Sequence, residues 1–493
     1  MENSIVEKKS IKVNALFSLI QSISAVIFPL ITFPYISRIF GVEQLGKYNY
    51  AKNFVEIFAT IAMLGIPTYG QREGAKVRDN RKELSNLMSE LFSLSMLSNA
   101  IAMLTLYLAT YAVDAFHSYA LLIVIFSVTI PMTTIGMSWL FVVFEDYNFT
   151  TILGIIFNIL SVVTMFLFVR TRTDIYLYAF ITVIASCGSN LIKFVYSKKY
   201  CDIKLTFHIN FRRHMKPILL MFSAYISVMI YNKTDTALLG VMGSDYNVGI
   251  YSVSTKVYNL VKSCLLALSN VLQTRAVLLA VQGNREKSDE FLSKSFNMMM
   301  TFVIPCMVGM AFMNKDIILF IAGKDYLEAG ISMIILSCSL FFALFSTMHS
   351  STILIPYGRE KVTLNGAIIG AVVNLLLNFI FIPIWKENGA ALTTLIAEAT
   401  VFLIYLRVTK QYYTHLNGIQ TMLQCLAGSA GIVLVLFIFR DWEINIVIRI
   451  IVKICASAIV YFVLQIITKN RIVIDLLDNA LKKINMNLGG KVK

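Results

Sequence analysis

The sequence predicts an all-α polytopic membrane protein with about 14 transmembrane helices, arranged as two pseudo-symmetric six-helix lobes plus two C-terminal helices. Three observations predict this fold class: an apolar composition, a series of segments long enough to cross a bilayer, and a glycine-containing motif that occurs twice. Of the 493 residues, 57% are hydrophobic and 14% are charged, whereas soluble domains carry about 25% charged residues. A soluble globular protein is therefore excluded.

The apolar segments have the length of membrane-spanning helices, because roughly 18–25 residues in a helix cross the hydrocarbon core. Alternating segments of about ten residues, which would indicate a transmembrane barrel, are absent. We expect the spans to begin near Val13, Tyr48, Ser85, Ala120, Thr150, Ile175, Pro217, Gly249, Phe296, Ile331, Val362, Gly389, Thr421 and Ile446.

An internal repeat relates the first half of the chain to the second. Gly46-x-Tyr48 recurs as Gly249-x-Tyr251, 203 residues later, and similar residues surround both copies. A repeat of this length indicates two structural copies rather than one continuous domain. Because each copy would contain six spans, both would enter the membrane in the same direction, as in parallel-repeat transporters.

The most polar and basic internal stretch, 198–216, separates six expected spans from the next six. We therefore assign an N-terminal lobe to 1–203, a C-terminal lobe to 204–416, accessory spans to 417–468 and a basic cytoplasmic tail to 469–493.

The positive charge follows the topology of a membrane protein. If the N-terminus is cytoplasmic, 28 of the 43 Lys and Arg residues lie in inside segments and 8 in outside loops. This asymmetry fits the positive-inside rule with both termini inside. It predicts a multi-pass protein of the cytoplasmic membrane, and it explains the net charge of +15 without a nucleic-acid partner.

Catalytic and metal-binding constellations are absent from the sequence. The seven cysteines form no CxxC motif and no Cys/His pairing, so we expect no metal site and no other cofactor. A membrane polymerase, ligase or glycosyltransferase would need a large loop that carries catalytic side chains, and the longest loops here have only about twenty residues. The sequence therefore favours a transporter over an enzyme.

Lysines at membrane depth are the main functional candidates. One ionisable residue at a helix centre costs roughly 2.5–3.5 kcal/mol, so four lysines facing lipid would cost on the order of 10 kcal/mol. We expect Lys52, Lys233 and Lys256 to share one level of a water-filled cavity, with Lys262 deeper. By contrast, we expect Lys193, Arg449 and Lys453 to extend their charged ends toward the membrane surface.

Carboxylates at the same depth are candidates for ion coupling. Asp235 is the leading one, and Glu56 and Glu398 also lie within apolar segments. Lys52 and Glu56 are four residues apart and can pair on one helix face. For Asp235 the alternative is a purely structural ion pair with a lysine of a neighbouring helix.

Fixed cations in a wet cavity imply an anionic substrate, and lysine binds phosphate as a point charge. Tyr251 and Asn259 follow the second motif copy and suit a ligand rich in hydroxyl groups. Hydrogen bonds between helices are an equally good explanation for these two side chains.

Four stretches resemble those of a known family. They are FPYISRIFGVEQLGKYNYAKNF at 33–54, LGIPTYGQREGAKVRDN at 64–80, DTALLGVMGSDYNVGIYSVSTKVYN at 235–259 and NLLLNFIFIPIWKENGAALTTLIAE at 374–398. In these the chain is similar to the polysaccharide-biosynthesis flippases of Wzx type, which carry O-antigen or capsule repeat units. These flippases belong to the multidrug/oligosaccharidyl-lipid/polysaccharide exporter superfamily.

The resemblance implies two lobes around a cavity that opens alternately to either side. The implied cargo is an oligosaccharide repeat unit on an undecaprenyl diphosphate carrier, with coupling to H⁺ or Na⁺. Membrane lipids and the polysaccharide polymerase and export machinery would be partners. The cationic cavity residues of the family correspond here to Arg38, Lys52, Lys233, Lys256 and Lys262. A drug or cation antiporter of the same fold and a peptidoglycan lipid-precursor flippase remain as alternatives.

Overall fold

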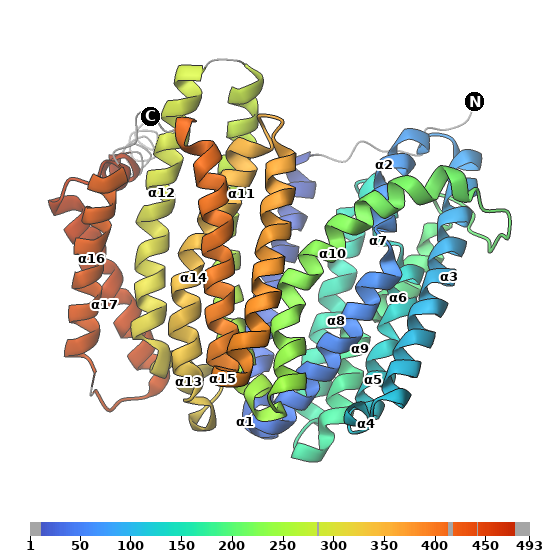
Figure 1. Cartoon of the computed structure of the whole chain (residues 1–493), viewed down its shortest axis with the longest axis horizontal. Helices are drawn as coiled ribbons and strands as arrows, with labels where there is room; N and C mark the ends of the chain where they lie inside the picture. The colour runs from blue at the N-terminus through green and yellow to red at the C-terminus, as the bar shows by residue number, and fades with distance from the viewer. Residues whose placement is uncertain (1–10, 283–284, 413–417, 441, 479–493) are drawn as a thin grey trace, which may run out of the picture. The chain divides into compact units, whose positions relative to one another are not determined.

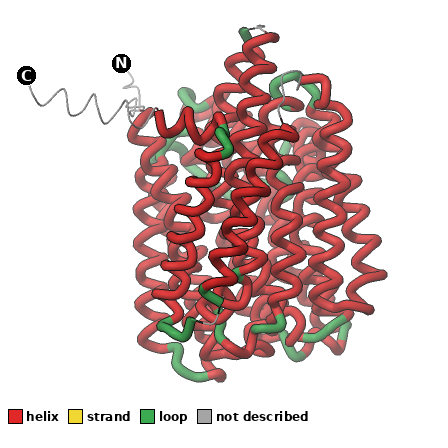
Figure 2. The backbone as a smooth tube through the Cα atoms, turned by 90° about the vertical axis from the view of Figure 1, so that its left-hand side faces the viewer, coloured by secondary structure: helices red, strands yellow, loops and turns green. Residues whose placement is uncertain are grey.

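The computed structural model describes residues 11–282, 285–412, 418–440 and 442–478. Every regular element within these ranges is helical (Figure 2), which confirms the all-α fold class. Residues 1–10 and 479–493, on which the expected cytoplasmic termini fall, lie outside the described residues.

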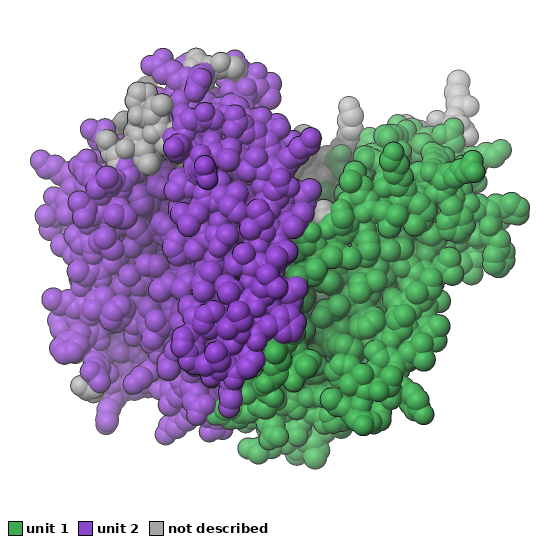
Figure 3. Space-filling model, viewed as in Figure 1, with its two compact units in different colours: residues 1–249 green, residues 250–493 purple. Residues whose placement is uncertain are grey.

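The chain divides into two compact units, 1–249 and 250–493, which are coloured separately in Figure 3. Unit 1 contains all helices up to α10 and the first residues of α11, and unit 2 contains the remainder. The lobe boundaries predicted from the basic stretch at 198–216 remain predictions.

Unit 1 is organised around α1, which packs against α3, α5, α8 and α10 (Figure 1). The side chain of Asn80 caps the start of α3 by accepting hydrogen bonds from the backbone N–H groups of Lys82 and Glu83, each at 3.2 Å. The helices of this unit are α1 (Ile11–Met63), α2 (Ile66–Val77), α3 (Arg81–Ala112), α4 (Asp114–His117), α5 (Ala120–Ser127), α6 (Thr129–Gly136), α7 (Ser138–Val143), α8 (Tyr147–Phe168), η1 (Arg172–Asp174), α9 (Ile175–Ser197) and α10 (Phe211–Met242).

In unit 2, α14 packs on α15 and on α12, while α16 joins α12 to α17. A short helical stretch at 471–478 follows α17. The helices of this unit are α11 (Asp245–Val281), α12 (Arg285–Phe312), α13 (Asn314–Ile321), η2 (Lys324–Tyr326), α14 (Ala329–His349), η3 (Ser350–Leu354), α15 (Glu360–Thr409), η4 (Lys410–Tyr412), α16 (Gly418–Ile438) and α17 (Ile446–Ile467).

The expected number of 14 membrane-spanning helices is not confirmed. Within the described residues, ten helices are long and apolar enough to cross a membrane, or eleven if the bent pair within α10 counts as one span. Two of the longest helices each combine two expected segments. The α1 helix is interrupted at Gly41 (φ 70°) and α15 at Lys386 (φ 51°). The length of an apolar segment predicts a membrane-spanning helix, but it does not show where one helix continues through a kink into the next segment.

The two copies of the repeated motif contact each other within unit 1. A methyl group added at Gly46 would lie 1.7 Å from the carbonyl oxygen of Asp245, and one added at Gly249 would lie 2.1 Å from that of Val42. Asp245 follows Val42 by the same 203 residues that separate Gly249 from Gly46. The contacts are therefore reciprocal, as expected where a pseudo-two-fold axis relates two copies of one surface. Neither glycine can carry a side chain at this distance.

Candidate functional site: ion pairs within the membrane-spanning helices

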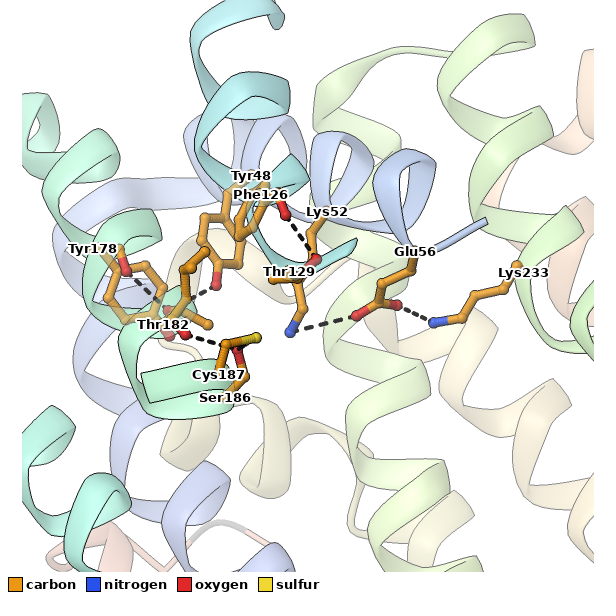
Figure 4. Close-up of polar contacts among 11 residues, drawn as sticks. Tyr48, Lys52, Glu56, Phe126, Thr129, Tyr178, Thr182, Ser186, Cys187 and Lys233 are labelled. Atoms are coloured by element: carbon orange, nitrogen blue, oxygen red, sulfur yellow. Dashed lines mark hydrogen bonds and ion pairs between the residues drawn. The ribbon is translucent and has the colours of Figure 1, made fainter. Parts of the chain in front are cut away.

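Two lysines from different helices share one carboxylate in unit 1. Lys52 and Glu56 lie one turn apart on α1, with Lys52 Nζ 3.9 Å from Glu56 Oε1. Lys233 of α10 donates a hydrogen bond to the other oxygen, Glu56 Oε2 (Figure 4). The three side chains are 34–40% exposed within the chain, so neighbouring helices leave part of each side chain uncovered. The predicted pairing of Lys52 with Glu56 is confirmed.

The cluster has a net charge of +1 when all three groups are ionised. A second contact fixes its geometry, because the buried Asn53 donates from Nδ2 to the backbone carbonyl of Lys233 at 3.1 Å. The α10 backbone is thus tied to α1 next to the ion pairs. Since one carboxylate serves two ammonium groups, an incoming anion can replace Glu56 as their partner without leaving any cation unpaired.

An aromatic cluster supports the segment of α1 that carries Lys52. The buried Tyr48 donates a hydrogen bond to Thr182 Oγ1 at 3.0 Å (Figure 4). Its ring lies 5.2 Å from that of Phe126 and 5.0 Å from that of Tyr178. Because Tyr48 precedes Lys52 by one helical turn, this packing holds the turn of α1 that carries Lys52.

A second ion pair lies in unit 2. Lys262 of α11 donates to Glu398 Oε1 of α15 at 3.2 Å and lies 3.3 Å from the hydroxyl of Tyr258. Glu398 is 5% exposed, and a buried carboxylate of this kind needs a paired cation. Two residues predicted to have separate roles, one in substrate binding and one in ion coupling, are thus in direct contact.

The other predicted residues have different environments. Asp235 on α10 and Tyr251 on α11 are buried, Lys256 is partly buried and Asn259 is exposed. Lys256 belongs to unit 2 and Lys52 and Lys233 to unit 1, so their shared cavity remains a prediction.

Arg38, which only the family resemblance suggested, lies exposed on α1. Its Nη1 donates to the carbonyl oxygen of Pro34 at 2.5 Å. It precedes Lys52 on the same helix, and its predicted role in substrate binding stays a prediction.

Arg449 and Lys453, which we expected to reach toward the membrane surface, both contact one carboxylate, that of Asp316. Lys453 is 4% exposed and donates to Asp316 Oδ2 of α13 at 2.6 Å. Arg449 Nε lies 3.3 Å from Asp316 Oδ1 but is not aligned for a hydrogen bond, so this second contact is purely electrostatic. A carboxylate partner offsets part of the free-energy cost of burying these two cations.

Sequence reasoning also missed a buried polar relay in unit 1. His214 is fully buried, with Nδ1 2.8 Å from the hydroxyl of Tyr69 and Nε2 2.9 Å from Glu90 Oε2. It joins α10 to α2 and α3. Glu90 was identifiable as a charge within an apolar segment, but no spacing in the sequence connects it with His214. Within the described residues, no group of three or more His, Cys, Asp or Glu side chains is placed to hold a metal ion.

Comparison with known proteins identifies a family and several relatives. Residues 11–272, more than half of the chain, match the family model described as "Polysaccharide biosynthesis protein". A relative from Escherichia coli (strain K12), named "Putative O-antigen transporter", is 22% identical over 413 residues, which cover 82% of this chain and 98% of the relative. The "Capsular polysaccharide biosynthesis protein CapF" of Staphylococcus aureus is 27% identical over 283 residues, 55% of this chain and 70% of that protein.

Among solved structures, "Lipid II flippase MurJ, inward closed conformation" superposes with a TM-score of 0.73 at 18% identity, covering 93% of this chain and 99% of that one. At this identity the likeness concerns the fold alone. Together with the matched family model and the apolar helices, these findings show that the chain belongs to the polysaccharide biosynthesis protein family and is a multi-pass membrane transporter rather than an enzyme.

Proposed function

We propose that the protein is a flippase that moves a lipid-linked oligosaccharide repeat unit across the cytoplasmic membrane for cell-surface polysaccharide biosynthesis. The carrier would be undecaprenyl diphosphate, and the cavity would open alternately to either side. The observation that carries this proposal is the pairing of Lys52 and Lys233 with the single carboxylate of Glu56. Such a cluster is cationic, partly exposed and able to exchange its own carboxylate for a phosphate group.

In this mechanism the diphosphate displaces Glu56 from Lys52 and Lys233, and Lys256 contributes from the second motif copy. Lys262, paired with Glu398, would extend the cationic path inward. Protonation of Glu56 or Asp235 would release the lysines for the substrate, which couples transport to an ion gradient. A carrier with about two negative charges that moves outward gains roughly 2.3 kcal/mol per charge per 100 mV of inside-negative potential.

The names of two relatives support this substrate class. One is named an O-antigen transporter and another a capsular polysaccharide biosynthesis protein. A drug or cation antiporter of the same fold would favour carboxylates and aromatic residues in its cavity, whereas two of the three charged side chains in the unit 1 cluster are lysines. A peptidoglycan-precursor flippase also handles a lipid diphosphate, so only an experiment separates it from the proposal.

The test is complementation of a strain that lacks its own repeat-unit flippase. We expect the wild-type chain to restore surface polymer and the triple variant Lys52→Ala, Lys233→Ala, Lys256→Ala to fail at matched levels of inserted protein. Single Lys233→Arg or Lys256→Arg variants should largely retain export. Lys324→Ala, an exposed lysine in η2, is the matched control.

Normal export by the triple alanine variant would refute the assignment of these lysines. Rescue of a strain that lacks its peptidoglycan-precursor flippase, without rescue of surface polymer, would instead favour that alternative.

A further inference from the structure

A second cationic site lies at one end of unit 2, apart from the ion pairs described above. A pocket of about 390 Å³ opens there between α11, α12, the η3–α15 turn and η4. No acidic side chain is among the described residues that line it. Its polar lining consists of Arg285, Tyr357, Arg359, Gln411 and Tyr412, with Leu279 on the apolar side.

Two tyrosines form a fixed wall of this pocket. The rings of Tyr357 and Tyr412 lie 4.8 Å apart, and Tyr412 is 8% exposed. Both pack against Leu292 and Ile353 in a small apolar cluster. The guanidinium of Arg359 lies over the ring of Tyr412, 6.0 Å from its centroid. The wall is therefore in place before a ligand binds.

A glycine turn and one hydrogen bond connect the segments that carry the two arginines. Gly358 adopts φ +68°, a left-handed conformation that glycine reaches without strain, and the turn it makes places Tyr357 and Arg359 at the pocket. The hydroxyl of Tyr357 lies 2.7 Å from Ser288 Oγ. Ser288 is one helical turn after Arg285 on α12, so this hydrogen bond ties the turn to the helix that carries Arg285.

Carboxylates compensate the charge of the two guanidinium groups only in part. Arg285 Nε lies 4.0 Å from Asp289 Oδ2, and its side chain is 73% exposed. Among the described residues, Arg359 forms no ion pair within 4.0 Å. Arg359 and the largely exposed Arg285, which has one long ion pair, can attract an anion, and the planar guanidinium matches a phosphate group with two parallel hydrogen bonds. The volume falls within the range of small-molecule sites, about 300–1,000 Å³.

We propose that this pocket binds the phosphate or diphosphate ester of a membrane lipid headgroup. Arg285 and Arg359 lie in segments that the charge asymmetry predicts to be cytoplasmic, where basic and aromatic side chains meet the headgroups of the inner leaflet. Each guanidinium can form the two parallel hydrogen bonds to a phosphate group that the lysines of the membrane-spanning cluster cannot form. The chemistry is shared by an anionic phospholipid and by a polyprenyl diphosphate.

The test measures lipid binding by the purified full-length protein, and polymer export is not its readout. Affinity is measured for an isoprenyl diphosphate, for phosphatidylglycerol in nanodiscs and for inorganic diphosphate. We expect the double variant Arg285→Gln, Arg359→Gln to lose at least about tenfold in affinity for the preferred lipid. The control Lys361→Gln changes an exposed cation close to Arg359 that does not line the pocket, and it should bind as wild type does.

Preferential loss of isoprenyl diphosphate binding would identify the carrier as the ligand, and preferential loss of phosphatidylglycerol binding would identify bulk anionic lipid. Equal affinity of the double variant and the wild type for both lipids would overturn the proposal. Inorganic diphosphate bound as tightly as the lipids would also overturn it, because the site would then recognise a soluble anion. If the double variant does not fold, the single variant Arg359→Lys keeps the charge and should weaken lipid binding by removing the bidentate contact.

Discussion

Each of three carboxylates, Glu56, Glu398 and Asp316, balances at least one cation from another helix. Glu56 holds two lysines, Glu398 holds Lys262, and Asp316 holds Lys453 and Arg449. Because a lone charge in the hydrocarbon is costly, such a partner is needed when no ligand is present. In the proposed mechanism the substrate diphosphate takes the place of Glu56, so Glu56 is the most informative single residue to change.

Replacing Glu56 with glutamine should strengthen binding of an isoprenyl diphosphate by the purified protein roughly tenfold. The reason is that removal of one negative charge about 4 Å from an ammonium group changes the local electrostatic energy by about 1–4 kcal/mol. Export of polymer should be lost in the same variant, because the lysines can no longer be returned to their resting partner.

Glu73 provides the matched control for this experiment. It also contacts two cations, Arg72 and Lys76, each at 2.9 Å, but it lies on the short α2 helix. Burial raises the pKa of Glu73, yet the hydrogen bonds from Lys76 and Arg72 outweigh this effect and keep the pKa below its usual value. Glu73→Gln should leave diphosphate affinity unchanged. An equal gain in both variants would mean that net charge, rather than competition at the lysines, determines affinity.

At the scale of elements, backbone contact between α1 and the start of α11 depends on two glycines. Alanine normally stabilises a helix by about 0.5–1 kcal/mol relative to glycine. At Gly46 and Gly249 the added methyl group would overlap a carbonyl oxygen, and overpacking of this kind costs about 1–3 kcal/mol or more. Gly46→Ala and Gly249→Ala should therefore each lower the thermal unfolding temperature in detergent, by similar amounts because the contacts are reciprocal.

Gly154→Ala is the control for these variants, because Gly154 lies in α8 and no atom would lie within 4 Å of the added methyl group. It should leave the unfolding temperature unchanged or raise it. If Gly46→Ala proves as stable as Gly154→Ala, the close contact between the two motif copies is absent in solution.

The docking of α17 on α13 depends on Asp316. Removing one partner of a buried ion pair costs about 3–5 kcal/mol, so Asp316→Asn should expose the α16–α17 hairpin to limited proteolysis. The double variant Asp316→Leu, Lys453→Met removes the main pair together and should be less sensitive than Asp316→Asn. Equal sensitivity of both variants would show that packing, rather than an unpaired charge, holds the hairpin.

At the scale of the whole molecule, the distribution of Lys and Arg predicts which loops face the cytoplasm, and cysteine labelling can test this topology. In a background in which Cys201 is the only native cysteine, a membrane-impermeant maleimide should label Lys324→Cys in intact cells. His208→Cys should react only after the membrane is opened, because the basic stretch at 198–216 is predicted to be cytoplasmic. The reverse pattern would invert the topology and contradict the charge argument.

Cys201 serves as the internal control of this labelling experiment. Its side chain is fully buried, and burial raises the pKa of the thiol to about 12. Below that pH the neutral thiol dominates, and it reacts slowly because the thiolate is the nucleophile. Cys201 should therefore remain unlabelled at neutral pH even in opened cells and become reactive on unfolding.

The sequence by itself determined those features that depend on local spacing and composition. Apolar length predicted membrane helices, and a four-residue spacing predicted the pair of Lys52 with Glu56. These relations hold because the period of a helix and the thickness of a bilayer act over a few turns.

Only the tertiary structure decided which distant charges meet. Lys233 is 177 residues from Glu56, Lys262 is 136 from Glu398, and Lys453 is 137 from Asp316. The same holds for the kinks that join expected spans within α1 and α15, and for the pocket that brings Arg285 to Arg359. The packing of one helix against another sets these positions. The spacing of residues within a single helix does not indicate which side chain of a neighbouring helix will lie opposite.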